Sequence, residues 1–61
     1  MCLSRVINVT ESGEKQIGEY ICKVRVSGDE IQLLDIMGQL TTVKGKILDI
    51  DLVGNQIRVA E

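Results

Sequence analysis

Glycine interrupts this sequence at short and fairly even intervals, at positions 13, 18, 28, 38, 45 and 54. The segments between the glycines are rich in Val, Ile and Leu, and the chain contains no proline. Val and Ile favour extended backbone, and glycine is the residue that most readily turns it. This spacing is typical of an all-β meander or barrel, because a turn follows every few extended residues. We therefore expect short antiparallel strands and no long helix.

Alternation of apolar and polar residues places the expected strands at residues 3–10, 15–20, 21–26, 31–37, 40–43, 46–53 and 56–60. The fourth segment is ambiguous, because Leu33, Ile36 and Met37 could also share one side of a short helix. Its β-branched residues favour a strand. So many short strands would leave bare edges in an open sheet, and closure removes them. The prediction is one domain, residues 1–61, folded as a small SH3-like barrel of about six or seven short antiparallel strands.

The size of the chain predicts a second copy. A domain of 61 residues is marginal alone, because it buries only roughly 60% of the surface that its unfolded chain exposes. The hydrophobic content of 44% is nevertheless ample. We therefore expect some apolar surface to be shared between protomers in a homodimer.

Composition argues against several classes of function. No secretory signal and no apolar run of about 20 residues is present, so we expect a cytoplasmic protein without membrane contact. Seven Lys plus Arg stand against nine Asp plus Glu, and Tyr20 is the only aromatic residue. A nucleic-acid binder normally carries a basic surface and stacking platforms, so nucleic acid is not an expected partner. The chain lacks His and any P-loop pattern, and we expect no enzymatic activity.

The first two residues, Met1 and Cys2, offer the most distinctive chemistry. An initiator Met is usually removed before a small residue, which would leave Cys2 with a free α-amine and a thiol on adjacent carbons. These two groups can close a five-membered ring around a divalent metal. If Met1 is retained, its amine and the Cys2 amide nitrogen could serve instead.

Two copies of Cys2 around a two-fold axis would supply two nitrogens and two sulfurs. Ni(II) or Cu(II) adopts square-planar geometry with such donors, and an isologous contact repeats the same residues from both chains. Because both donors must lose protons, binding should weaken as pH falls. The alternative interpretation is that Cys2 is an incidental terminal residue.

Other candidate residues have simpler explanations. Cys22 falls on an apolar face with Val24 and Val26, where a free Cys behaves as a small buried hydrophobe. Asp49 and Asp51 share a predicted strand face near Asp35 or Glu30, and a solvated barrel face explains them better than an acid–base pair or a hard-cation site. The basic residues could form a weak patch, although charges that protect exposed strands are the simpler reading; these are Lys15, Lys23, Arg25, Lys44 and Lys46.

Three stretches of the sequence resemble the CooT family of small proteins tied to nickel handling for carbon monoxide dehydrogenase. They are Met1-Cys2, residues 28–31 (GDEI) leading into 34–36 (LDI), and residues 43–52 (VKGKILDIDL). The resemblance spans nearly the whole chain. It implies a small β-barrel homodimer that binds Ni(II) through the N-terminal Cys, which is Cys2 here. The same family is also labelled as predicted RNA-binding, a role that the charge and the aromatic content do not support.

The resulting prediction is a nickel-binding accessory protein that holds Ni(II) through Cys2 at a dimer interface. It would act as a metallochaperone, with a carbon monoxide dehydrogenase or its maturation factors as partner. The alternative is an RNA-binding or protein-interaction module on a small β-barrel, which would use an exposed strand face or the basic residues.

Overall fold

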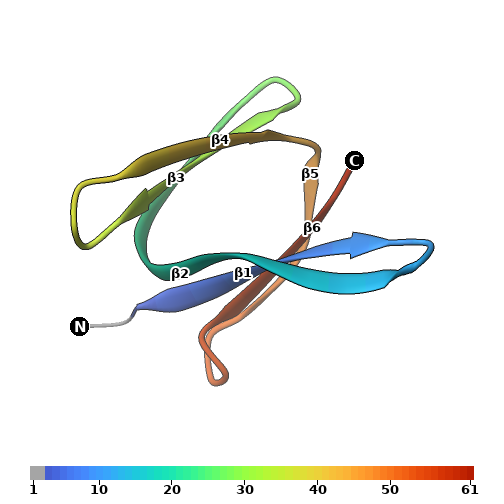
Figure 1. Cartoon of the computed structure of the whole chain (residues 1–61), viewed down its shortest axis with the longest axis horizontal. Helices are drawn as coiled ribbons and strands as arrows, with labels where there is room; N and C mark the ends of the chain where they lie inside the picture. Colours follow the sequence, from blue (N-terminus) through green and yellow to red (C-terminus); the bar gives the residue numbers. More distant parts are fainter. Residues whose placement is uncertain (1–2) are drawn as a thin grey trace.

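The computed structural model describes residues 3–61, which form six strands in one sheet (Figure 1). The strands are β1 (Ser4–Thr10), β2 (Gly13–Ser27), β3 (Glu30–Asp35), β4 (Leu40–Lys44), β5 (Lys46–Asp51) and β6 (Gln56–Ala60). Their order in the sheet is β4-β3-β2-β1-β6-β5. The all-β prediction is therefore confirmed, and the ambiguous fourth segment is a strand.

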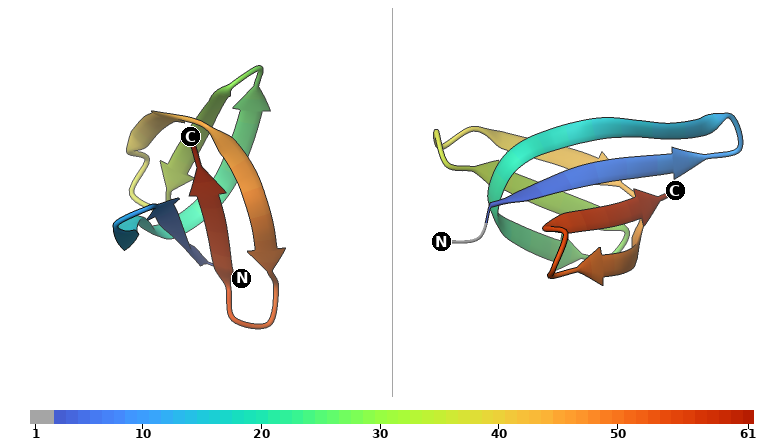
Figure 2. Two further views of the ribbon diagram at one scale, coloured as in Figure 1. Left: turned by 90° about the vertical axis from the view of Figure 1, so that its right-hand side faces the viewer. Right: turned by 90° about the horizontal axis from the view of Figure 1, so that it is seen from below.

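The strands β1 and β6 run parallel, whereas each of the other neighbouring pairs is antiparallel. The first strand thus lies beside the last one, in register from Arg5 with Gln56 to Asn8 with Val59. This pairing joins the two ends of the sequence. Figure 2 shows the strongly curved sheet that results.

The long strand β2 covers the two segments that the sequence divides at residues 20 and 21. Its first half pairs with β1, and its second half turns to pair with β3. The register slips around Gly18, as expected for a glycine inside a strand. A Cβ atom at Gly18 would lie 3.2 Å from the side chain of Ile21, so the glycine lets the bent strand approach its own core. Tyr20 completes the bend with a φ of 56°, which is unusual for a residue with a side chain.

The face assignment predicted for residues 21–26 is wrong for two residues, because β2 contains a second bulge. Ile21 pairs with Asp35 and Lys23 pairs with Leu34, so Cys22 is an extra residue in the ladder. A bulge shifts the alternation of the strand by one position. Ile21 is consequently buried, whereas Cys22 is exposed rather than packed in the core.

The core lies inside the curve of the sheet and is built by strands distant in sequence. Its buried members are Val6, Ile21, Ile31, Leu33, Ile57 and Val59. Ile17, Val24, Val43 and Ile47 pack around them. The strict alternation of β3 and β6 places their odd-numbered apolar residues inside.

The sheet is barrel-like, but among residues 3–61 no pairing joins the edge strands β4 and β5. A sharp corner at Gly45 connects them, with a φ of 145° and its N–H donating to the Asp29 carbonyl oxygen at 2.7 Å. A Cβ atom at Gly45 would collide with the Ala60 carbonyl group, 2.8 Å from its carbon. Only glycine can therefore occupy this corner without displacing the chain end.

The apolar residues Leu48, Ile50 and Leu52 alternate in the sequence, but they do not form a buried face. The register of the β5–β6 ladder slips between Ile47 and Asp49, so Leu48 lies at a bulge. In addition, β5 is an edge strand with one open side. Ile47 packs against the core, but Leu48, Ile50 and Leu52 are exposed. Within residues 3–61 no helix could cross a bilayer.

Candidate functional site

Exposed apolar side chains gather where the chain enters the sheet. Leu3 is half-buried, and exposed neighbours come from the bend in β2 and from the turns after β3 and β5. We call this group the N-terminal rim; it consists of Leu3, Tyr20, Ile36, Met37, Leu52 and Val53. Figures 1 and 2 place the start of β1 and the turn between β3 and β4 at the same end of the molecule, and Figure 1 shows the turn between β5 and β6 at the bottom, apart from the β3–β4 turn. Met37 is 87% exposed and Val53 is 97% exposed, so the rim includes the most solvent-accessible large apolar residues of the described chain.

Backbone hydrogen bonds fix the parts of the rim. The Ile36 N–H donates to the carbonyl oxygen of Tyr20 at 3.0 Å, which ties the turn after β3 to the bend of β2. The Arg5 N–H donates to the Asn55 carbonyl oxygen at 2.9 Å, which ties the start of β1 to the turn after β5. Because these contacts involve the main chain, the apolar side chains project from an ordered frame.

Two aspartates order the rim turns. The Asp35 Oδ1 accepts from the N–H groups of Met37 and Gln39, each at 2.9 Å. Likewise, the Asp51 Oδ1 accepts from Val53 at 3.0 Å and from Gly54 at 2.9 Å. Such side-chain bonds replace backbone partners within a turn. Asp35 and Asp51 therefore serve the turns. Asp49 and Asp51 lie two positions apart in an unbroken part of the β5–β6 ladder, so they share a strand face as predicted.

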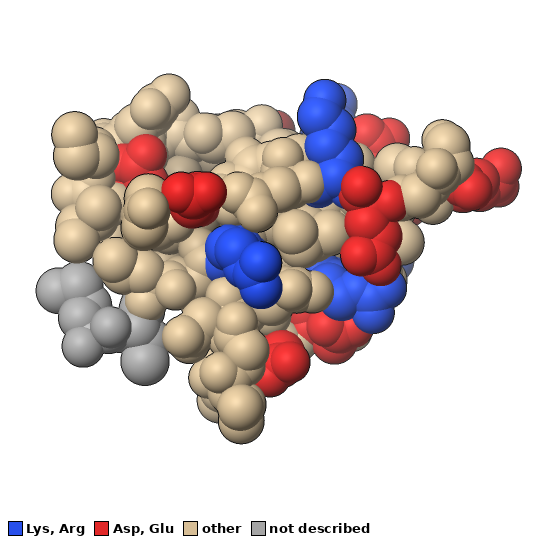
Figure 3. Space-filling view, turned by 60° about the horizontal axis from the view of Figure 1, so that its bottom comes forward, with Lys and Arg blue, Asp and Glu red and all other residues tan. Residues whose placement is uncertain are grey.

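A shallow hollow of about 420 Å³ lies beside Leu3. It is lined by Leu3, Arg5, Glu19, Tyr20, Gly54 and Asn55. On the face shown in Figure 3, the left-hand part of the molecule carries acidic groups among uncharged residues, and the Lys and Arg side chains lie towards the middle and right. The end of the molecule that bears the chain start thus combines a hollow with exposed apolar groups.

The predicted metal ligand Cys2 lies outside the described residues. Between residues 3 and 61 no group of three or more His, Cys, Asp or Glu side chains could hold a metal. Cys22 is a single exposed thiol whose Sγ lies 3.5 Å from the Leu34 carbonyl oxygen as a weak donor.

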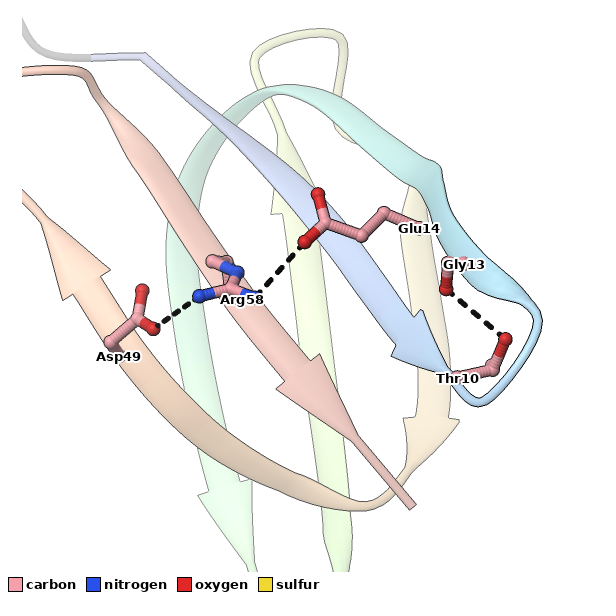
Figure 4. Close-up of polar contacts among 5 residues, drawn as sticks. All are labelled: Thr10, Gly13, Glu14, Asp49 and Arg58. Atoms are coloured by element: carbon pink, nitrogen blue, oxygen red, sulfur yellow. Dashed lines mark hydrogen bonds and ion pairs between the residues drawn. The ribbon is translucent and has the colours of Figure 1, made fainter.

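The remaining acidic candidate, Asp49, belongs to an ion-pair network on the outer face of the sheet. Arg58 Nη1 lies 3.1 Å from the Asp49 Oδ2, and Arg58 Nη2 lies 3.0 Å from the Glu14 Oε2 (Figure 4). Glu14 is on β2 and Arg58 is on β6, so the contact spans β1. The predicted solvated face is correct for Asp49, and its partner there is an arginine.

The five basic candidates do not form one patch. Lys23 and Arg25 lie together on the outer face of β2, beside a second hollow of about 220 Å³. Lys44 faces Glu30 across the β3–β4 ladder. Lys15 lies opposite Asn8 in the β1–β2 hairpin, and Lys46 lies opposite Ala60.

A six-stranded sheet curved around a small aliphatic core, with its first and last strands parallel, defines a class of small barrel-like all-β proteins. A crystal structure assigned to CooT from Carboxydothermus hydrogenoformans matches this chain with a TM-score of 0.90. The match covers 98% of this chain and 97% of the other, at 25% sequence identity. An uncharacterized protein from Archaeoglobus fulgidus is 33% identical over 39 residues, which are 64% of this chain and 87% of the relative.

The sequence also matches the model of the family described as "CO dehydrogenase accessory protein CooT" over residues 1–60. The chain therefore belongs to the CooT family, and the resemblance in the sequence is confirmed. The description of the family is that of an accessory protein of CO dehydrogenase.

The N-terminal rim was not predicted from the sequence. Its members come from four separate segments, and each looks like an ordinary core residue within its own strand pattern. The available signal was the excess of aliphatic residues over what a 61-residue chain can bury. That excess predicted a shared surface but not its location.

Proposed function

We propose that this protein is a nickel-binding accessory protein for CO dehydrogenase, and that Cys2 from each of two chains holds Ni(II) at a dimer interface. The observation that carries the proposal is the N-terminal rim around Leu3, the residue that directly follows Cys2 in the sequence. Membership of the CooT family supports the link to CO dehydrogenase.

Exposed apolar side chains at the chain start are a reason to pair that end with a second copy. Large apolar residues such as Leu52 and Val53 are costly to leave in water, at roughly 25 cal/mol for each Å². A two-fold contact through the rim would bury the same residues from both chains. It would also bring the two copies of residue 2 to the same interface.

The donor set suits nickel. Thiolates and amines bind divalent metals of intermediate softness, and two chains supply four such donors. The described part of the chain offers no competing cluster of ligands. The role of this chain would be to hold the two thiols close together and to keep that end ordered through the rim contacts.

The proposal is tested by nickel titration of wild type, Cys2→Ser and Cys22→Ser, following the thiolate-to-metal absorption band. We expect the band in wild type and in Cys22→Ser, with saturation at about one Ni(II) per two chains. Loss of the band is expected only in Cys2→Ser. Equal nickel uptake by wild type and Cys2→Ser would refute the site.

Two further measurements define the donors. The intact mass of the purified protein shows whether Met1 is removed, and so whether the Cys2 amine is free. Because the donors must lose protons, nickel affinity should fall as pH is lowered. Affinity that does not change with pH would contradict coordination by a thiol and an amine.

The proposed recipient of the metal is a CO dehydrogenase or one of its maturation factors, in the cytoplasm, where thiols remain reduced. A holding role requires no catalytic groups, in agreement with an accessory function. Transfer of nickel from the loaded dimer to apo CO dehydrogenase, measured as gain of activity, checks this step. No gain over free Ni(II) at the same concentration would contradict the hand-off.

A further inference from the structure

The outer face of strands β2, β3 and β4 carries a hollow that the nickel proposal does not use. Its volume is about 220 Å³, and it is lined by Lys23, Arg25, Gln32, Leu34 and Leu40. We call it the β2–β4 hollow. In the ladders, Arg25 pairs with Gln32 and Lys23 pairs with Leu34, which in turn pairs with Leu40. The hollow is therefore built by adjacent positions on three neighbouring strands.

The charge of this face is opposite to that of the whole chain. Among the outward positions of the β2–β3 and β3–β4 ladders, the cations are Lys23, Arg25 and Lys44, and the only anion is Glu30. Glu30 lies opposite Lys44 in the register, which leaves the cations of the hollow without an acidic neighbour there. Within residues 3–61, the ion pairs under 4.0 Å all involve Arg58. Thus a protein with a net charge of −2 presents a locally positive hollow.

The hollow is also apolar in part. Leu40 is exposed and Leu34 is half-buried, and both line it beside the cations. Its lining contains no aromatic side chain on which a base could stack, because the single aromatic residue is Tyr20 in the N-terminal rim. A mixed apolar and cationic surface fits a peptide that carries both apolar and acidic side chains better than it fits a nucleic acid.

We propose that the β2–β4 hollow binds an extended acidic segment of a partner protein. A Leu-like side chain of the segment packs on Leu34 and Leu40, and carboxylates two positions away, which share its face in an extended chain, pair with Lys23 and Arg25. Gln32 supplies an amide that can donate to or accept from the backbone of the segment. This site is separate from the proposed nickel site, because none of its lining residues belongs to the N-terminal rim.

The test is an NMR titration of the ¹⁵N-labelled Cys2→Ser protein, free of nickel, with a synthetic Glu–Leu peptide. This peptide repeats Glu-Ser-Leu-Ser, so that Glu and Leu share one face when it is extended. The ligand controls are matched peptides in which Ser replaces Glu (the Ser–Leu peptide), Ser replaces Leu, or Lys replaces Glu, together with a short oligo(U) RNA. We expect the Glu–Leu peptide to shift the signals of the residues that line the hollow, with at least tenfold tighter binding than any control. Using Cys2→Ser keeps a failure of this proposal distinct from a failure of the nickel site.

The test variant combines Lys23→Glu and Arg25→Glu in one protein. It should weaken binding of the Glu–Leu peptide at least tenfold. Lys15→Glu with Lys46→Glu is the matched control, because it makes the same charge change outside the hollow and should leave binding unchanged. The spectrum of each free variant shows whether it is folded. Equal binding of the Ser–Leu peptide, shifts located elsewhere, no shift at millimolar peptide, or tighter binding of the RNA would each overturn the proposal.

Discussion

The core of this protein and its N-terminal rim are made of the same kinds of side chain in opposite surroundings. In the core, Ile31 and Leu33 are fully buried by strands far apart in the sequence. In the rim, Leu52 and Val53 stand almost fully in solvent on a turn that Asp51 orders. A chain of this size closes one core and has aliphatic residues to spare. The most exposed part of this surplus, Met37, Leu52 and Val53, belongs to the rim, whereas other exposed aliphatic residues such as Leu48 and Ile50 lie on the edge strand β5.

The largest effect is expected from a cavity in the core. Leu33→Ala should lower the free energy of unfolding by about 2–5 kcal/mol, the range for a fully buried leucine. A core this small rarely supplies more than about 3–5 kcal/mol in total, so this variant should be largely unfolded. Urea denaturation followed by circular dichroism, at one protein concentration, measures it.

The matched control for the core is Leu48→Ala, the same substitution at an exposed position of an edge strand. It should cost less than about 1 kcal/mol. Equal losses in the two variants would show that the division between buried and exposed aliphatic residues is wrong.

The second-largest loss of stability is expected at Gly45, in the corner that joins the edge strands β4 and β5. Gly45→Asn should destabilise by roughly 1–3 kcal/mol or more, because a side chain there requires a strained φ and meets the Ala60 carbonyl. Gly28→Asn is the control: its φ is 60°, which Asn tolerates, and no heavy atom lies within 4 Å of the added Cβ. Thermal unfolding of both variants compares them, and a lower melting temperature for the Gly28 variant would contradict the account.

A rim substitution should act on the dimer rather than on the fold. Val53→Ser should weaken self-association at least tenfold, or about 1.4 kcal/mol, because each copy loses an apolar side chain at the proposed contact. The free energy of unfolding of this variant, measured at low protein concentration, should stay within about 0.5 kcal/mol of the wild-type value. Sedimentation equilibrium measures the association. Leu48→Ser, also exposed but outside the rim, should leave it unchanged, and the reverse result would move the interface to β5.

The smallest effect is expected from the ion pairs on the outer face. Glu14→Gln removes one partner of Arg58 and should cost no more than about 1 kcal/mol, because the pair is well exposed to solvent. The loss should shrink in high salt, since screening weakens exposed pairs. Urea denaturation at low and high ionic strength checks this. A loss as large as that of Leu33→Ala would mean that the outer face, rather than the core, holds the sheet together.

Sequence patterns were most informative where strands are regular. In β3 and β6 the alternation is unbroken, and strands form in the segments predicted at residues 31–37 and 56–60. The patterns failed at the bulges, where an extra residue inverts the faces and exposes Cys22. The parallel pairing of β1 with β6 was also not predicted, because no local signal joins segments at opposite ends of a chain.

The candidate site also has one part that the sequence predicted and one part that it did not. Cys2 could be proposed from its own chemistry, without any knowledge of its neighbours. The rim that surrounds Leu3 could not, because it exists only once the bend at Tyr20 and two turns have been brought together by the fold.

The central claim is that one nickel site is shared by two chains at the rim, and native mass spectrometry of wild type titrated with Ni(II) tests it most directly. The account predicts dimers that carry a single Ni(II) and monomers that carry none. In Val53→Ser, the fraction of dimer and the amount of bound nickel should fall together. Nickel bound to monomers, or two Ni(II) in each dimer, would contradict a shared site.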